Sequence, residues 1–224
     1  MRLFYQHIDI PLVGLSKFTV IHRMESIRRT ILKAAIKRFS HFGFNKTSMA
    51  EIASDAGITK TKLYYYYTDK EELEQCVLRF IWKEIIDKQY AVAYNYKNNL
   101  MEILDGLLEL NANFIKKNYA IFLSQNMKYL KEKRYNEIFY HKASEDLELI
   151  SYLLKHAVNA GEISLHEELN VVTTNYLRII RALSLESCIS DIITGVPNVE
   201  NIDSMLTSQK LATKAIFLPK VKKL

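Results

Sequence analysis

Glycine, proline and cysteine are all scarce in this sequence. Its 224 residues include six Gly, three Pro and two Cys, and 49% of the residues are hydrophobic. Few helix-breaking residues in a chain with ample apolar content favour a mostly helical globular protein over a β-rich or disordered one. The length is sufficient to bury a substantial core, in one domain or in two.

The two cysteines, Cys76 and Cys188, have no Cys or His close by at the spacing of metal ligands. Each lies among apolar residues of an expected helix. We interpret them as buried thiols of a reducing cytosol, with a redox switch as the less favoured alternative.

Membrane and export signals are also missing. No apolar run approaches the roughly 18 residues that a membrane span needs. Gln6, His7 and Asp9 interrupt the first residues, where a signal peptide would have a continuous apolar core. We therefore expect a cytoplasmic protein that does not contact a membrane.

The sequence shows none of the common enzyme signatures. Its six histidines are scattered, and it has no Ser-His-Asp arrangement, glycine-rich phosphate loop or helical His-Glu-x-x-His. We therefore expect no catalytic residues, no metal site and no cofactor.

Acidic residues are few at the N-terminal end. Residues 1–70 hold 12 Lys/Arg and five Asp/Glu, whereas residues 71–224 hold 19 Lys/Arg and 20 Asp/Glu. The net charge of +6 thus comes entirely from the first third of the chain. Such a distribution is expected when one part of a protein faces a polyanion such as DNA.

The stretch 48–73 predicts short helices separated by a glycine turn. Ser48 and Glu51 can form a capping box, which starts a helix near Met49. Gly57 tolerates the left-handed conformation that closes a helix.

A second helix follows directly. Thr59 can cap a helix that includes residues 62–67, and Asp69 with Glu72 can form another capping box that opens a third. Two short helices joined by a tight glycine turn make a helix-turn-helix, whose second helix enters the major groove of DNA.

The expected second helix carries side chains suited to DNA. No acidic residue lies between Gly57 and Thr68, and hydroxyl and ammonium groups on the first turn can meet base edges and phosphates. We expect Leu63 and Tyr67 to pack inward. The amides at the start of the preceding helix can also attract a phosphate. The candidate DNA contacts are Thr47, Ser48, Thr59, Lys60, Thr61, Lys62, Tyr64, Tyr65, Tyr66 and Lys70. The alternative is an ordinary solvated helix with an aromatic edge.

Residues 25 to 75 carry a longer pattern that resembles the tetracycline-repressor (tetR) family. The residues that match are Phe39, Gly43, Phe44, Thr47, Ser48, Ile52, Ala53, Ala56, Gly57, Ile58, Thr59, Lys60, Leu63, Tyr64, Tyr65, Asp69, Lys70, Glu71, Glu72 and Leu73. Thr61, Lys62 and the pair Tyr66-Tyr67 depart from the residues that are commoner there. These departures affect the expected DNA sequence preference and leave the fold expectation unchanged.

The resemblance implies an all-α fold in three parts: an N-terminal extension (1–23), a three-helix DNA-binding domain (24–72) and a helical bundle for ligand binding and dimerisation (73–224). It implies a homodimeric repressor that binds a palindromic operator in double-stranded DNA and is released by a small-molecule effector. A DNA-binding protein without an effector is the alternative.

Apolar periodicity predicts the helices around the helix-turn-helix. A long helix from Glu71 to about Tyr94 should link the DNA-binding part to the remainder and act as a rigid lever. Its inward residues should be Leu73, Val77, Phe80, Ile81, Ile85 and Ile86. The other expected helices are Glu25–His41, Leu100–Lys117, Tyr119–Lys131, Tyr135–Ala160, Glu167–Ser190 and Asn201–Phe217.

Residues 1–23 show no helical period and contain Pro11 and Gly14. Two interpretations are open for this segment. It is either a basic arm that touches DNA or an upstream extension of the reading frame, with translation starting at Met24.

By resemblance, the helices Glu167–Ser190 and Asn201–Phe217 would pair with those of a second copy. Their apolar residues include Val171, Val172, Tyr176, Ile179, Ile180, Leu183, Leu185, Met205, Leu211 and Ile216. An effector pocket could be lined by Tyr90, Tyr94, Phe114, Phe122, Met127, Tyr152 and Tyr176, although each of these is individually more typical of a plain core.

Overall fold

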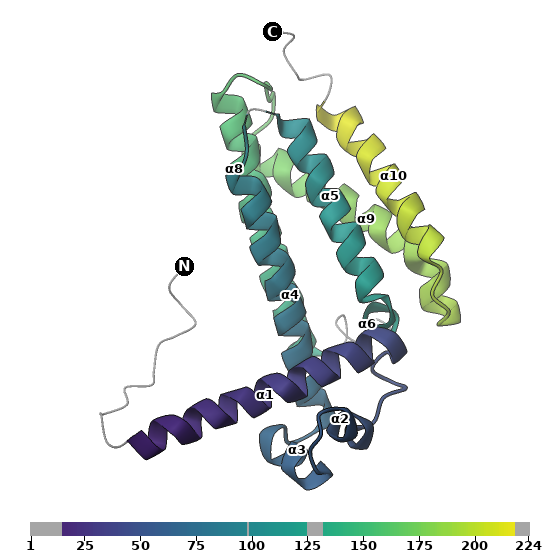
Figure 1. The fold of residues 1–224 in the computed structure, drawn as a ribbon. Helices are drawn as coiled ribbons and strands as arrows, with labels where there is room; N and C mark the ends of the chain where they lie inside the picture. Colours follow the sequence, from purple (N-terminus) through teal and green to yellow (C-terminus); the bar gives the residue numbers. More distant parts are fainter. Residues whose placement is uncertain (1–14, 98, 125–131, 218–224) are drawn as a thin grey trace.

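The computed structural model describes residues 15–97, 99–124 and 132–217, and every regular element within these ranges is a helix. The small N-terminal unit and the bundle above it confirm the predicted all-α architecture (Figure 1). The helices are α1 (Leu15–Phe42), α2 (Met49–Asp55), α3 (Lys60–Tyr66), α4 (Lys70–Tyr94), α5 (Leu100–Lys117), α6 (Tyr119–Ser124), α8 (Lys133–Asn159), α9 (Leu169–Thr194) and α10 (Val199–Phe217).

Most of the predicted bundle helices are found within four residues of their expected bounds. Helix α5 has the predicted ends, and α8, α9 and α10 differ from theirs by at most four residues. The helix expected over Tyr119–Lys131 is represented by α6, which ends at Ser124, and residues 125–131 lie outside the described part of the chain. None of the described helices combines the length and apolarity that a membrane crossing requires.

The first helix starts earlier than the sequence pattern predicted. Residues 15–23 form the first part of α1, so the expectation that residues 1–23 lack helix is wrong for this stretch. Once a helix has nucleated, each added residue gains one backbone hydrogen bond without a new nucleation cost, and the amphipathic segment from Glu25 onward provides that nucleus. Residues 1–14 lie outside the described residues.

Helix α4 belongs to both parts of the protein. Its 25 residues correspond to about 37 Å of helix. Its first turns contribute Leu73 and Val77 to the core of the N-terminal unit, and its later part packs on α5 and α8 (Figure 1). Phe80, which was expected to point inward, is 48% exposed, and Ile86 is only partly buried. The neighbouring helices, not apolarity alone, decide which face of α4 is covered.

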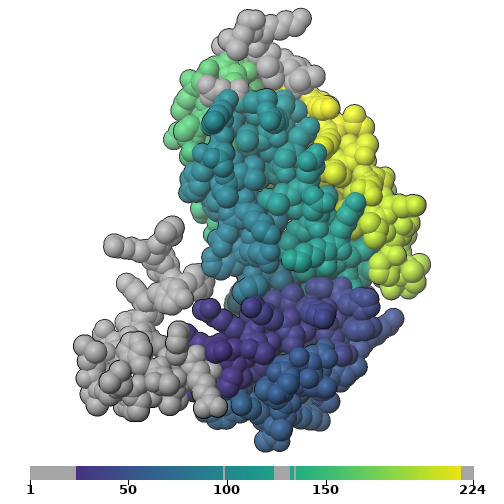
Figure 2. Space-filling model, in the orientation of Figure 1, coloured from purple at the N-terminus to yellow at the C-terminus, as the bar shows by residue number. Residues whose placement is uncertain are grey.

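A continuous core joins the two parts. Ile121 of α6 and Tyr135 of α8 belong to the same buried cluster as Phe39 of α1. The Tyr135 hydroxyl donates a hydrogen bond to the buried Glu74 carboxylate of α4, at 3.0 Å. The N-terminal unit and the bundle therefore pack as one body at this level (Figure 2).

The bond between Tyr135 and Glu74 should contribute measurably to stability. Tyr135→Phe removes a donor from a buried carboxylate, so we expect the free energy of unfolding to fall by about 1–3 kcal/mol in a urea titration. Tyr94→Phe is the control, because Tyr94 is 73% exposed and its change should have no measurable effect. Equal stability of Tyr135→Phe and the unchanged protein would contradict a stabilising role for this bond.

Candidate nucleic-acid interface

Helix α2 begins at the predicted capping box. The Ser48 hydroxyl oxygen accepts from the Glu51 amide at 3.3 Å, and the Glu51 carboxylate accepts from the Ser48 amide at 2.8 Å. The helix ends where Gly57 adopts a φ of +65°, in the left-handed region that glycine occupies without strain. The predicted helix and turn are therefore both present.

Helix α3 begins with a cap on Thr59, whose hydroxyl oxygen accepts from the Lys62 amide at 3.2 Å. Leu63 is fully buried and Tyr67 is 4% exposed, so the two residues that were expected to pack inward do so. Asp69 caps α4 by accepting from the Glu72 amide at 2.7 Å. The Glu72 carboxylate accepts hydrogen bonds from the amide and the hydroxyl of Thr68.

The outer face of α3 is polar, basic and aromatic. Lys60, Thr61 and Lys62 are exposed, and Tyr65 is 73% exposed. The Lys60 ammonium lies 5.9 Å from the centroid of the Tyr64 ring, one turn further along the helix. This face lies at the end of the N-terminal unit that is remote from the bundle, where a large partner can reach it (Figures 1 and 2).

Two predicted contacts lie on the wrong side of the structure. Tyr66 is only 6% exposed, because it lies three residues after the buried Leu63 and shares its face of α3. Thr47 is 3% exposed, and its hydroxyl donates to the Gly43 carbonyl at 2.9 Å. Neither side chain is accessible to DNA in this arrangement. The Thr47 amide, which was expected to be free for a phosphate, donates to the Phe44 carbonyl at 3.3 Å, so the predicted roles of Tyr66 and Thr47 do not fit this structure.

Ser48 and Lys70 are accessible but already have partners. The Ser48 hydroxyl donates to Glu51 at 2.8 Å, and hydrogen bonds from Ser48 lower the pKa of the Glu51 carboxyl below its ordinary value. This carboxylate lies where a phosphate would approach the start of α2. The partly buried Lys70 ammonium lies 3.8 Å from Glu74. The strongest remaining candidates are Thr59, Lys60, Thr61, Lys62, Tyr64 and Tyr65.

Two arginines of α1 position the helix-turn-helix. The sequence pattern did not predict this role for either of them. Arg38 donates to Asp55 at 2.6 and 3.0 Å and to Glu51 at 2.9 Å, and so ties α1 to α2. Arg28 reaches the Tyr66 carbonyl at 3.5 Å and lies 5.9 Å from the centroid of the Tyr67 ring. Only the fold reveals these roles, because each arginine meets a segment far along the chain.

A cavity of about 530 Å³ lies within the bundle. Phe114, Phe122 and Tyr176 line it as predicted, together with residues of α4, α5, α6, α8, α9 and α10. Its side chains are mostly apolar. The charged groups come from α8 and α9, and uncharged polar groups such as Gln89, Asn111 and Gln209 come from α4, α5 and α10. The volume falls within the range of small-molecule sites.

Three of the other predicted pocket residues lie elsewhere. The Tyr90 hydroxyl donates to Glu145 at 3.0 Å, and Tyr90 is not part of the cavity wall. Tyr94 and Tyr152 are 73% and 40% exposed, with ring centroids 6.4 Å apart on the outside of the bundle. Met127 lies outside the described residues.

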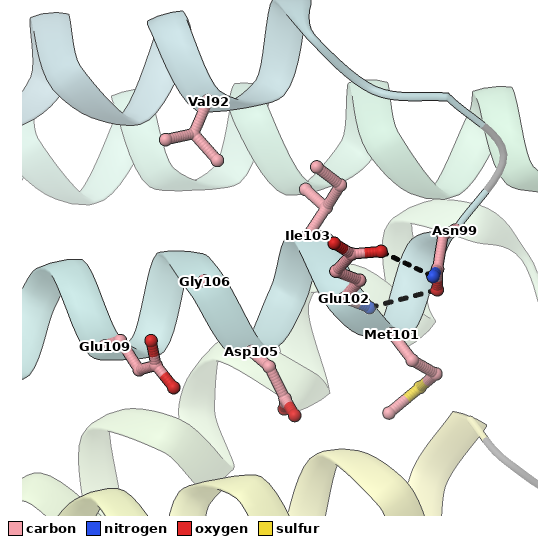
Figure 3. Close-up of a pocket in the computed structure, with 8 residues that line it drawn as sticks. All are labelled: Val92, Asn99, Met101, Glu102, Ile103, Asp105, Gly106 and Glu109. Atoms are coloured by element: carbon pink, nitrogen blue, oxygen red, sulfur yellow. Dashed lines mark hydrogen bonds between the residues drawn. The ribbon is translucent and has the colours of Figure 1, made fainter.

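A second hollow, of about 660 Å³, lies beside α5 (Figure 3). Only eight residues line it, seven of them at 99–109 along α5, so it surrounds a ligand less completely than the bundle cavity does. Its Glu102 side chain accepts from the Asn99 amide group at 2.7 Å, and its Glu109 pairs with Lys210. Of the two hollows, the bundle cavity is therefore the one that residues of several helices enclose.

The geometry defines a class of protein: a helix-turn-helix with an exposed basic second helix, mounted on a helical bundle that contains a cavity. Residues 31–75 match the family model "Bacterial regulatory proteins, tetR family". The helix-turn-helix unit of this chain is therefore similar to that of the tetR-family regulators, as the sequence pattern predicted. A family of regulatory proteins also agrees with the expectation that the chain is not an enzyme.

Individual relatives extend this result. The chain is 48% identical over 54 residues to the HTH-type transcriptional regulator RutR of Escherichia coli, which covers 24% of this chain and 26% of RutR. It is 27% identical over 139 residues to the negative transcriptional regulator IcaR of Staphylococcus epidermidis, which covers 62% of this chain and 65% of IcaR. The matched stretch thus spans about a quarter of RutR and less than two thirds of IcaR.

The bundle is similar to known structures as well. A transcriptional regulator from Cytophaga hutchinsonii superposes with a TM-score of 0.77 at 18% identity, covering 86% of this chain and 97% of that one. At this identity the likeness concerns the fold, and it extends over both the helix-turn-helix and the bundle.

The cap on α3 should be worth about 1 kcal/mol. Thr59→Ala removes the side-chain acceptor of the Lys62 amide, and we expect the free energy of unfolding to fall by about that amount in chemical denaturation. Thr61→Ala is a matched control, because Thr61 is exposed on the same turn and caps nothing. Should both variants be equally stable, the cap would not hold α3 in place.

Proposed function

We propose that this protein is a homodimeric, cytoplasmic transcriptional repressor that binds a palindromic operator and leaves it when a small molecule enters the bundle. The observation that carries the proposal is the outward face of α3. Lys60, Lys62, Tyr64 and Tyr65 are exposed together on a helix without acidic residues. Ammonium and phenol groups of this kind donate to phosphates and base edges in a major groove.

The outer face of α9 supports dimerisation. Its exposed apolar residues are Val171, Ile179, Leu185, Ile189 and Ile193, all at least 41% exposed. At about 100° per residue they fall within an arc of roughly 120°, so they form one stripe. The stripe lies opposite the buried residues Thr173 and Leu177. A contiguous apolar stripe on a surface is typical of an interface between proteins.

Helix α10 extends this surface. It packs against α9, and its Leu211 is 63% exposed. A second copy that covered the α9 stripe would complete the two-fold arrangement that a palindromic site requires. In this arrangement the two α3 helices would enter major grooves one turn apart, about 34–36 Å.

The position of the cavity supports release by an effector. Trp82 and Gln89, both on α4, lie in its wall, and α4 continues to the Asp69 cap directly after α3. A ligand that preferred one placement of α4 would thereby shift the spacing of the two α3 helices. A coupling free energy of about 1–3 kcal/mol is typical of such regulation.

The alternative is a DNA-binding protein without an effector, in which the bundle only dimerises. The cavity favours the effector model, because a bundle that served only pairing could be packed solid. Repression is favoured over activation by the similarity to IcaR, whose name describes a negative regulator.

Changes on α3 should abolish operator binding. Lys60→Ala and Tyr64→Ala each remove a candidate DNA contact from an exposed position, so binding should be lost while the thermal unfolding midpoint stays unchanged. The operator is first located by genomic footprinting, and affinity is then measured by gel shift at fixed salt.

Lys83→Ala is the control for these variants, because Lys83 is an exposed lysine on α4, outside the helix-turn-helix. It should bind the operator normally. Normal binding by both α3 variants would refute the assignment of α3 as the recognition helix.

A charge in the apolar stripe should separate the dimer. Ile189→Asp with Ile193→Asp places two carboxylates where the partner is expected, so sedimentation should give a monomer with greatly weakened operator binding. Val158→Asp is the control, because Val158 is a 38% exposed apolar residue on a different helix, α8. A stable dimer in the double variant would place the interface elsewhere.

A further inference from the structure

The bundle cavity has one charged corner, in a wall that is mostly apolar and elsewhere contains only uncharged polar groups such as Gln89, Asn111 and Gln209. Lys142 of α8 is 7% exposed and pairs with Asp146, one turn along the same helix. Asp146 also lies 3.7 Å from the guanidinium of Arg181 on α9. Lys142 and Arg181 thus share Asp146, the one carboxylate among the described residues of the cavity wall. Glu145 also acts on Lys142, but it accepts from Tyr90 and does not line the cavity. The lining groups of this corner therefore carry more positive than negative charge.

A second unbalanced group borders the same corner. The Lys142 ammonium lies 5.8 Å from the centroid of the Trp82 ring. The Trp82 indole N–H is fully buried and has no acceptor among the residues that the structure describes. A buried donor without a partner is costly, and such groups mark places where a ligand supplies the missing acceptor.

Aromatic rings form the wall next to this corner. The ring centroids of Phe114, Phe122 and Phe139 lie 5.2, 5.4 and 5.8 Å from that of Trp82. Leucine and isoleucine side chains line much of the remainder. The cavity therefore offers a long apolar surface with hydrogen-bond donors and positive charge at one place.

We propose that the effector is an amphipathic organic acid with a single carboxylate on an apolar, preferably aromatic, body. The carboxylate would accept from the Lys142 ammonium and the Trp82 N–H, and the body would lie against the phenylalanine rings. The Lys142 ammonium lies 5.8 Å from the centroid of the Trp82 ring, a separation that two hydrogen bonds of about 3 Å each can span. The assignment rests on the proposed function insofar as it names the ligand that would cause release.

Other ligand charges fit this corner less well. A cation would be repelled by Lys142, which already occupies the face of the Trp82 ring. A dianion would bury a charge that the corner cannot balance. Burial lowers the pKa of Lys142, and a bound carboxylate would oppose this effect by stabilising the charged form.

The protein carries its own reporter for the test, because Trp82 is its single tryptophan. The full chain is titrated with phenylbutyrate, its neutral amide phenylbutyramide, and phenylbutylammonium, while Trp82 emission is recorded. These probes share one body and differ in charge. We expect the acid to change the emission and to bind at least about tenfold more tightly than the amide, because it alone makes charge-assisted hydrogen bonds. The cation should bind most weakly.

Variants locate the carboxylate. Lys142→Met keeps the length of the side chain and removes its charge, so calorimetry should show about tenfold weaker binding of the acid and unchanged binding of the amide. Lys210→Met is the matched control, because Lys210 also pairs with a carboxylate but lies outside the cavity. It should bind the acid normally. If Lys142→Met does not fold, the comparison of the three probes on the unchanged protein still tests whether the cavity prefers a carboxylate.

Equal binding of acid and amide, tighter binding of the cation, or no binding of any probe would overturn the assignment. Operator binding without ligand is measured in parallel and separates the two proposals. A chain that binds DNA but not the acid would contradict only the ligand assignment. A chain that binds the acid but no DNA would contradict only the repressor function.

Discussion

The burial of the first turns of α4 between the N-terminal unit and the bundle is the constraint on which the rest of the structure depends. Leu73 and Val77 enter the core beneath α1, and Glu74, one position away, is held by the Tyr135 hydroxyl of α8. A buried carboxylate must keep its hydrogen bonds, so α4 cannot turn or slide here without breaking contacts on both sides. The position of α3 relative to the bundle follows from this joint.

The same joint explains how a change in the bundle could be felt at the DNA-binding face. Trp82 and Gln89 line the cavity farther along α4, and the Asp69 cap at its start closes the short turn after α3. A helix transmits displacement along its length because each of its backbone hydrogen bonds resists bending. Two arginines of α1 fix the position of the helix-turn-helix relative to α1. Arg28 donates to the Tyr66 carbonyl at the end of α3, and Arg38 donates to Asp55 and Glu51 of α2.

The polar groups of the cavity and those of the DNA-binding face differ in whether water or other protein groups satisfy their charges and hydrogen bonds. On α3, Lys60 and Lys62 are solvated, so their charge costs little while no partner is bound. In the bundle, the buried Lys142 shares Asp146 with Arg181, and the buried Trp82 N–H has no acceptor among the described residues. Bulk water satisfies the first set in the free protein, whereas a buried N–H needs an acceptor inside the cavity. This contrast is the physical basis for assigning a polyanion to one site and a small acid to the other.

The sequence by itself determined the features that depend on neighbours a few positions away. Ser48 with Glu51, Thr59 with the Lys62 amide, and the left-handed Gly57 set the helix-turn-helix, because caps and turns are local interactions. Periodicity likewise predicted α5, α8, α9 and α10 closely. Only the tertiary structure decided that Tyr66 and Thr47 are buried, that Phe80 is exposed, and that Tyr94 and Tyr152 lie outside the cavity. It also brought Lys142, Asp146, Arg181 and Trp82 into one corner. Burial and pairing of this kind depend on which helices pack together, and contacts between residues far apart in the chain leave no periodic trace in the sequence.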